Sequence, residues 1–144
     1  MSEISDKIHE KCLAFGDRIV KLNDYLLKEA ANKKPTYKIV NGKRVYDKPV
    51  PVYLLSVANI CNQLLRAGTS IGANNAEATN AVSRQDFRAK SYIALKEARE
   101  SLYWIELLHR NKYLDDKQYA SLHSDCEELV KILVVRCKKL DTEG

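Results

Sequence analysis

Charged side chains that could act as acids and bases gather around one part of the chain. Glu97 and Glu100 are three residues apart and would therefore lie on one side of a helix. Paired carboxylates can do acid–base work, but they can equally belong to a partly buried ion-pair and hydrogen-bond network that fixes helix register. The sequence shows no phosphate-binding loop and no nucleophile–base motif, so the network is favoured. We call its predicted members the polar seam: Arg66, Ser70, Asn74, Glu77, Glu97 and Glu100.

The strongest indication of a metal site is the pair Glu106 and His109. Their Glu-x-x-His spacing is the one used by di-iron carboxylate bundles, which need a second such pair and two further inward glutamates. Neither His9 nor His123 has a glutamate three residues before it. A histidine near a helix C-terminus is also favoured by the helix dipole. We therefore expect no metal, no cofactor and no catalytic residue.

A basic segment, Lys33–Lys48, could bind nucleic acid. It holds six cations and a single anion, Asp47, and so accounts for the whole net charge of +5. Cations can contact phosphates while a tyrosine stacks on a base. The alternative is a hairpin whose lysines keep its edges soluble, and the residues alone do not decide between the two. The candidate nucleic-acid-binding residues are Tyr37, Lys38, Lys43, Arg44, Tyr46 and Lys48.

The same segment is predicted to form a β-hairpin at about residues 36–47. Asn41-Gly42 lies between short runs of Tyr, Val and Ile, and this dipeptide readily supplies the two positive φ angles of a type I′ turn. In that register Tyr37 faces Tyr46 and Ile39 faces Arg44. Because an isolated two-stranded hairpin is marginal in water, we expect it to pack on the bundle, on a sister subunit or on a partner.

Apolar residues at three- and four-residue spacing predict four amphipathic helices, at about residues 5–32, 52–79, 84–111 and 116–140. Ser83 with Asp86 and Asp115 with Gln118 predict capping at the start of the last two helices. Short connections between helices of similar length are typical of antiparallel neighbours. The fold class is therefore all-α: an up-down-up-down antiparallel four-helix bundle with a short β-hairpin inserted between helices one and two.

Rows of very small residues mark two of the predicted helices. Glycine inside a helix costs roughly 1 kcal/mol relative to alanine, so two glycines on one stripe indicate a close approach of backbones. We expect the stripe on the second helix to pack against the stripe on the third. The two stripes are Gly68, Gly72 and Ala76 on the second helix, and Ser91, Ala94, Ala98 and Ser101 on the third.

Length and composition place limits on the class of protein. A chain of 144 residues with 45% apolar residues fits a single domain, residues 1–144, with a sizeable core. Its apolar runs are too short to span a bilayer, and the charged start of the chain lacks the apolar region of a secretory signal. We expect a cytoplasmic protein. The four cysteines contain no C-x-x-C pair and are expected to be buried, reduced thiols: Cys12, Cys61, Cys126 and Cys137.

Three sequence words resemble a known family. They are SIGANNAEA, the helix start SRQDF, and IALKEARE followed by YWIELL. In this order they resemble the four-helix-bundle proteins encoded in intervening sequences of bacterial large-subunit ribosomal RNA genes, a family related in fold to Avd, the accessory protein of diversity-generating retroelements. The resemblance is strong from about Leu54 to Leu108. Its matching residues are Ser70, Ile71, Gly72, Ala73, Asn74, Ala76, Glu77, Ser83, Asp86, Phe87, Ala94, Leu95, Glu97, Glu100 and Trp104.

This resemblance implies a homopentameric ring of four-helix protomers without known catalysis. For the Avd branch it further implies binding to a reverse transcriptase and to nucleic acid. The inserted hairpin departs from the family pattern and leaves the partner open. We therefore expect a non-enzymatic homo-oligomeric binding protein that engages RNA, or a reverse-transcriptase/RNA complex, through its basic surface. The alternative is a protein-binding scaffold or accessory subunit without direct nucleic-acid contact.

Overall fold

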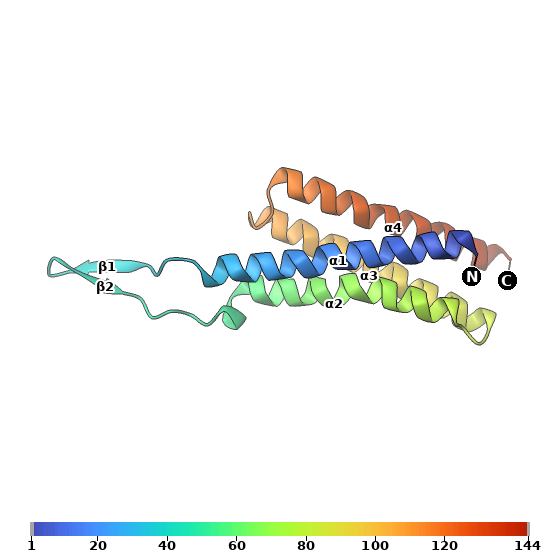
Figure 1. Cartoon of the computed structure of the whole chain (residues 1–144), viewed down its shortest axis with the longest axis horizontal. Helices are drawn as coiled ribbons and strands as arrows, with labels where there is room; N and C mark the ends of the chain where they lie inside the picture. Colours follow the sequence, from blue (N-terminus) through green and yellow to red (C-terminus); the bar gives the residue numbers. More distant parts are fainter. Residues whose placement is uncertain (1, 144) are drawn as a thin grey trace.

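The structure, a computed structural model, describes residues 2–143 and shows four long antiparallel helices with a hairpin at one end (Figure 1). The predicted fold class is confirmed. The elements are α1 (Glu3–Ala31), β1 (Tyr37–Val40), β2 (Lys43–Tyr46), the short 3-10 helix η1 (Val52–Leu54), α2 (Ser56–Thr79), α3 (Arg84–Arg110) and α4 (Asp116–Thr142).

Local signals set several helix boundaries. The hydroxyl oxygen of Ser83 accepts a hydrogen bond from the Asp86 amide at 3.0 Å. The Asp115 carboxylate accepts from the Gln118 amide at 2.7 Å, and the Gln118 side chain accepts from the Asp115 amide at 3.0 Å. Both predicted caps are therefore confirmed. The second helix begins later than residue 52, because Leu55 is extended and separates η1 from α2.

The helices pack in chain order around α2 and α3. α1 lies against α2 and α4 lies against α3, while α1 and α4 contact each other only sparsely. Two ion pairs of 2.6 Å cross between these outer helices, Lys11 with Glu128 and Arg18 with Asp125. Burial of each large apolar side chain contributes about 1.5–3 kcal/mol. The largest fully buried ones include Phe15, Ile19, Leu64, Ile71, Ile105, Leu108, Leu129 and Leu133.

Gly68 and Gly72 of the predicted α2 stripe face α1, so their predicted pairing with the stripe of α3 is wrong. A Cβ atom on Gly68 would stand 3.1 Å from the Ile19 side chain, and one on Gly72 would stand 3.2 Å from the Cβ atom of Cys12. The small residues of α3, Ser91, Ala94, Ala98 and Ser101, are fully buried, and the carbonyl of Ala98 accepts a hydrogen bond from the Cys126 thiol of α4. The four cysteines are buried free thiols, as predicted.

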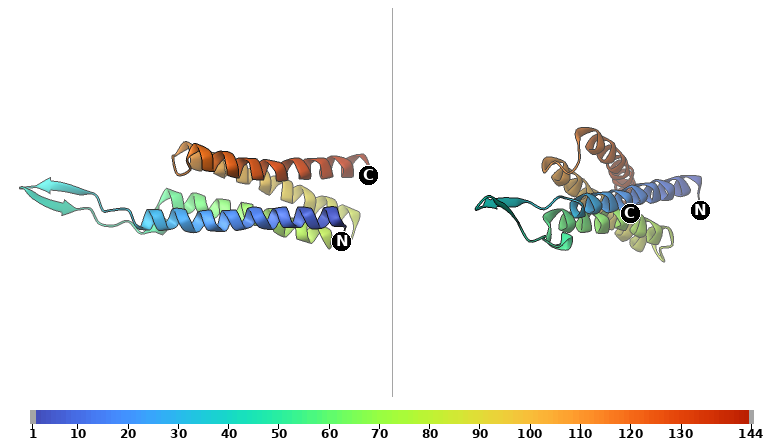
Figure 2. Two further views of the ribbon diagram at one scale, coloured as in Figure 1. Left: turned by 45° about the horizontal axis from the view of Figure 1, so that its top comes forward. Right: turned by 60° about the vertical axis from the view of Figure 1, so that its left-hand side comes forward.

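The hairpin extends away from the helices, beyond the end of the bundle where α1 finishes (Figures 1 and 2). Asn41 and Gly42 have φ angles of 51° and 75°, which confirms the predicted turn. The predicted register is also confirmed. Every residue from 31 to 51 is exposed, so the hairpin does not pack on its own bundle. No helix in the part of the chain that the structure describes has the length and hydropathy of a membrane-spanning segment.

Candidate nucleic-acid interface

The strand register divides the predicted nucleic-acid-binding residues between two faces of the hairpin. Directly opposite residues of an antiparallel pair point to the same face. Tyr37, Arg44 and Tyr46 therefore share one face with Ile39. On this face the guanidinium of Arg44 lies 4.8 Å from the centroid of the Tyr37 ring, and the two tyrosine rings meet edge to face at 5.6 Å. We call these three residues the aromatic face.

The opposite face carries two lysines beside small apolar side chains. Lys38 and Lys43 share it with Val45 and Val40, their respective cross-strand partners. Lys48 follows β2, just beyond Asp47, whose amide donates to the carbonyl of Thr36 at 2.9 Å. The structure therefore places five of the six candidate residues on the two strands and Lys48 just beyond them, with the cations divided between the two faces.

The cations of this segment lack carboxylate partners. Within residues 2–143, none of the six cations of Lys33–Lys48 lies in an ion pair. The one carboxylate of this segment, on Asp47, accepts a hydrogen bond from the Thr36 hydroxyl. Helical cations such as Arg18, Arg66 and Arg88 do have acidic partners. The positive potential of the hairpin is thus not neutralised by the rest of the described chain.

A protruding basic hairpin with exposed tyrosines can make two kinds of contact with RNA. Its ammonium and guanidinium groups can meet phosphates, whose contribution weakens as salt rises. The Tyr46 side chain is 54% exposed and offers a surface on which a base could stack.

The acidic residues of the polar seam lie partly together. Arg66 is 2.9 Å from a Glu100 oxygen and 4.0 Å from a Glu97 oxygen. Burial, followed by the neighbouring Glu100 carboxylate, raises the pKa of Glu97, and Arg66 opposes this effect. Arg66 of α2 therefore bridges to Glu97 and Glu100 of α3, and the Glu97 carboxyl group holds its proton more tightly than usual.

Within the described chain, the other predicted members of the polar seam form no side-chain hydrogen bond or ion pair with the two glutamates of this bridge. The Ser70 hydroxyl donates to the carbonyl of Arg66 at 2.6 Å, and the Asn74 amide donates to the carbonyl of Ser70 at 2.8 Å, so both bond within α2. Glu77 forms its ion pair with Lys90. The six residues therefore do not form one connected network.

Glu106 and His109 are also placed by the structure. Glu106 is exposed, and the imidazole Nε2 of His109 lies 2.7 Å from the Asp116 carboxylate. The His109 ring stacks on Tyr119, with 4.1 Å between ring centroids. Among the described residues there is no group of three or more His, Cys, Asp or Glu side chains that could hold a metal ion. The contacts of His109 with Asp116 and Tyr119 connect the end of α3 to the start of α4.

Two inward-facing polar residues were not among the predicted site residues. Asn75, not Asn74, is the asparagine of α2 that is almost fully buried, and it accepts a hydrogen bond from Arg136 of α4. The signal in the sequence was the position of Arg136 within the apolar stripe of the fourth helix.

Comparison with known proteins places the chain in a family. Residues 53–135, more than half of the chain, match the model of the 23S rRNA-intervening sequence protein family. A search of curated proteins found no match. A crystal structure of a protein of unknown function from the S23 ribosomal protein family of Bacteroides thetaiotaomicron is similar, with a TM-score of 0.72 and 36% identity over 93% of this chain and 97% of that one. The chain belongs to the 23S rRNA-intervening sequence protein family.

Proposed function

We propose that this protein is a non-enzymatic, homo-oligomeric RNA-binding protein whose hairpin makes the RNA contacts. The observation that carries the proposal is the set of six exposed cations on the hairpin and its flanks, none of them paired with a carboxylate in the described chain. The description of the family model refers to an rRNA intervening sequence, which supports RNA over other polyanions.

The size of the effect follows from counterion release. If Lys38, Lys43, Arg44 and Lys48 each neutralise one phosphate of single-stranded RNA, the logarithm of the binding constant falls with the logarithm of salt concentration at a slope of about −3. At physiological salt these four contacts correspond to roughly a hundredfold in affinity. A base stacked on a tyrosine would add about 1–3 kcal/mol.

A homopentamer is part of the proposal. The number five is what the family resemblance implies. Self-association itself is supported by exposed apolar side chains seven residues apart on α1, Leu13 and Val20, which are 49% and 44% exposed. Tyr53 and Leu54, between the hairpin and α2, are exposed as well. Several hairpins in one ring would bind one RNA with an increased effective concentration. A mass measurement in solution that gives a monomer would refute the ring.

The test replaces the four cations Lys38, Lys43, Arg44 and Lys48 with glutamine. Binding to a labelled single-stranded RNA is then followed by fluorescence anisotropy over a series of salt concentrations. We expect roughly a hundredfold loss of affinity and a much flatter salt dependence. The matched control removes the same charge from exposed helical lysines without ion pairs in the described chain: Lys21, Lys117, Lys131 and Lys138. Equal RNA binding by the two variants would contradict the proposal that the hairpin makes the RNA contacts.

A second candidate function is a protein-binding scaffold. Its supporting observation is the exposure of Ile39, Val40 and Val45 on a hairpin that touches none of the helices, at 63%, 49% and 51%. A partner retained after nuclease treatment in a pull-down from the native host would favour this function. In the retroelement form of the proposal, the partner is a reverse-transcriptase/RNA complex. A reverse transcriptase should then copurify with the protein, and nuclease treatment or loss of the hairpin cations should release it.

A further inference from the structure

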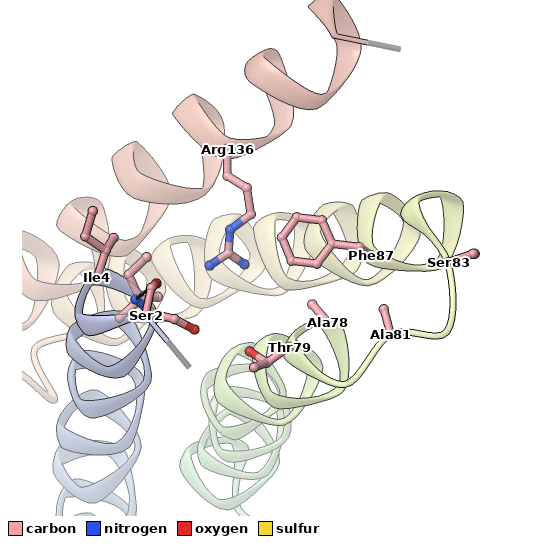
Figure 3. Close-up of a pocket in the computed structure, with 10 residues that line it drawn as sticks. Ser2, Ile4, Ala78, Thr79, Ala81, Ser83, Phe87 and Arg136 are labelled. Carbon is pink, nitrogen blue, oxygen red and sulfur yellow. Dashed lines mark hydrogen bonds between the residues drawn. The ribbon is translucent and has the colours of Figure 1, made fainter.

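A pocket opens where the start of α1 and the turn between α2 and α3 meet (Figure 3), at the end of the bundle opposite the hairpin (Figure 1). It measures about 680 Å³, is open to solvent, and is lined by residues from all four helices. The start of α1 contributes Ser2 and Ile4, the end of α2 contributes Ala78 and Thr79, and the following turn and the start of α3 contribute Ala81, Ser83 and Phe87. α4 contributes a single residue, Arg136, whose guanidinium points into the space between these elements.

Arg136 is held in this pocket by neutral groups. Its Nη1 donates a hydrogen bond of 2.8 Å to the side-chain oxygen of Asn75, which is only 1% exposed. Its guanidinium carbon lies 5.4 Å from the centroid of the Phe87 ring, within the range of a cation–π contact. The amide and the aromatic ring orient the guanidinium without neutralising its charge. Within residues 2–143 its Nε and Nη2 donate no hydrogen bond to a protein side chain and can meet a ligand.

No carboxylate within residues 2–143 lies at ion-pair distance from Arg136. This distinguishes it from Arg18, Arg66, Arg84 and Arg88, each of which has an acidic partner. Burial lowers the pKa of Arg136, because desolvation disfavours its charged form. A partly desolvated cation without a counterion is unfavourable, so an anion that enters the pocket would relieve this cost.

The pocket lining favours a monoanion with an apolar body. One guanidinium balances one negative charge, and its planar fork matches a carboxylate. Ile4, Ile8, Ala78, Ala81 and Phe87 supply apolar walls. The hydroxyl groups of Ser2 and Ser83 accept the cap bonds of their own helices and can still donate a proton to an anion.

A dianion fits this end of the bundle less well. The positive ends of α1 and α3 face the pocket, but acidic residues in the first turns of the same helices offset them: Glu3, Asp6 and Asp86. A phosphate dianion would therefore bring two negative charges to a pocket in which Arg136 supplies one full positive charge. The carboxylate is the better match in charge and in shape.

We propose that the Arg136 pocket binds a carboxylate carried on a small apolar body, with Arg136 as the residue that recognises it. Two sources share this chemistry: a free short-chain monocarboxylic acid, and the side chain of a glutamate within a peptide. Neither depends on the hairpin or on RNA.

The test uses NMR of uniformly labelled protein, following the Nε–Hε signal of Arg136 during titration with isobutyrate. We expect a saturable shift that the isosteric neutral amide, isobutyramide, does not produce. Arg136→Gln, which keeps a donor for Asn75, should weaken binding at least tenfold when amide signals of the pocket are followed, while Arg110→Gln, an exposed arginine on α3, should leave binding unchanged. Ala81→Leu, which narrows the pocket from the turn between α2 and α3 and keeps the arginine, should also weaken binding.

Two further titrations complete the experiment. A blocked glutamate peptide that binds more tightly than isobutyrate identifies the peptide source, and the reverse order identifies the free acid. Inorganic phosphate that binds more tightly than either would overturn the assignment of a carboxylate. The proposal also fails if the Arg136 signal does not saturate with any carboxylate, or if Arg136→Gln binds isobutyrate as the unmodified protein does.

Discussion

Gly72 of α2 lies so close to Cys12 of α1 that a Cβ atom at residue 72 would stand 3.2 Å from the Cβ atom of Cys12. The Cβ atom of Cys12 is fixed to its helix, so it cannot turn away as the end of a long side chain could. Alanine at residue 72 gains about 1 kcal/mol of helix propensity, but overpacking a well-packed contact costs about 1–3 kcal/mol. We expect Gly72→Ala to lower the free energy of unfolding by roughly 1 kcal/mol in urea titrations.

Gly16 provides the matched control on α1. Nothing lies within 4 Å of the position that a Cβ atom would take there. Gly16→Ala should therefore gain only the propensity term and raise the free energy of unfolding by about 0.5–1 kcal/mol. Equal gains for both alanine variants would show that the contact at Gly72 relaxes without cost, and the overpacking expected there would be wrong.

Gly42 allows the hairpin to be unfolded without touching the bundle. Its φ angle of 75° is unfavourable for a side chain, by about 1–2 kcal/mol, and valine is a particularly poor choice there. Because the hairpin projects from the bundle and is exposed throughout, Gly42→Val should abolish hydrogen-exchange protection of the Asp47 amide. The free energy of unfolding of the helices should stay within about 0.5 kcal/mol of its original value.

A different result would be equally informative. If Gly42→Val lowers the stability of the helices, or lowers it in a way that depends on protein concentration, then the hairpin packs on another surface in solution. The claim that the hairpin unfolds without affecting the helices would then be wrong. The exposed Ile39 and Val45 would be the first residues to test for contacts with that surface.

Local chemistry made much of this fold predictable. Asn41-Gly42 specifies a turn type, and the turn type specifies the register that pairs Tyr37 with Tyr46. Ser83 and Asp115 fix helix starts through bonds to residues three positions away. Each of these features depends on a few consecutive residues, which is why the sequence alone was sufficient.

Relationships between elements could not be predicted in the same way. The spacing of Gly68 and Gly72 shows that one face of α2 is small, but not that α1 covers it. Strand propensity does not determine whether a hairpin folds back on the helices or points away from them. The Arg136 pocket requires Asn75 and Phe87 from two other helices. The sequence indicated it only through the position of Arg136 within the apolar stripe of the fourth helix.

Glu97 should make the stability of the protein depend on pH. Its pKa is raised in the folded state, first by burial and then by Glu100. Between the unfolded value and the raised folded value the folded state binds the proton more tightly, so the free energy of unfolding falls as pH increases through this window. Glu97→Gln should flatten that slope and leave the protein at least as stable at neutral pH. The measurement is urea unfolding at a series of pH values.

The control for this prediction is Glu106→Gln. Glu106 lies on the same helix but is exposed, and its substitution should keep the slope of the original protein. If Glu97→Gln also keeps that slope, the proton on the Glu97 carboxyl does not contribute to the pH dependence of folding.

The four cysteines should be almost unreactive while the protein is folded. Burial raises the pKa of Cys12 and of Cys61 to about 11 and that of Cys126 to about 12. At pH 8 a thiol with a pKa near 11 is deprotonated about one part in a thousand, and the thiolate is the reactive form. We expect a thiol–disulfide exchange reagent to label all four residues rapidly in denaturant and only slowly in the native protein. Ser124→Cys, at an exposed position on α4, should add one fast equivalent under native conditions. Fast labelling of the original cysteines in the native state would mean that the helices open on the timescale of the reaction, because a closed core shields these thiols from both water and reagent.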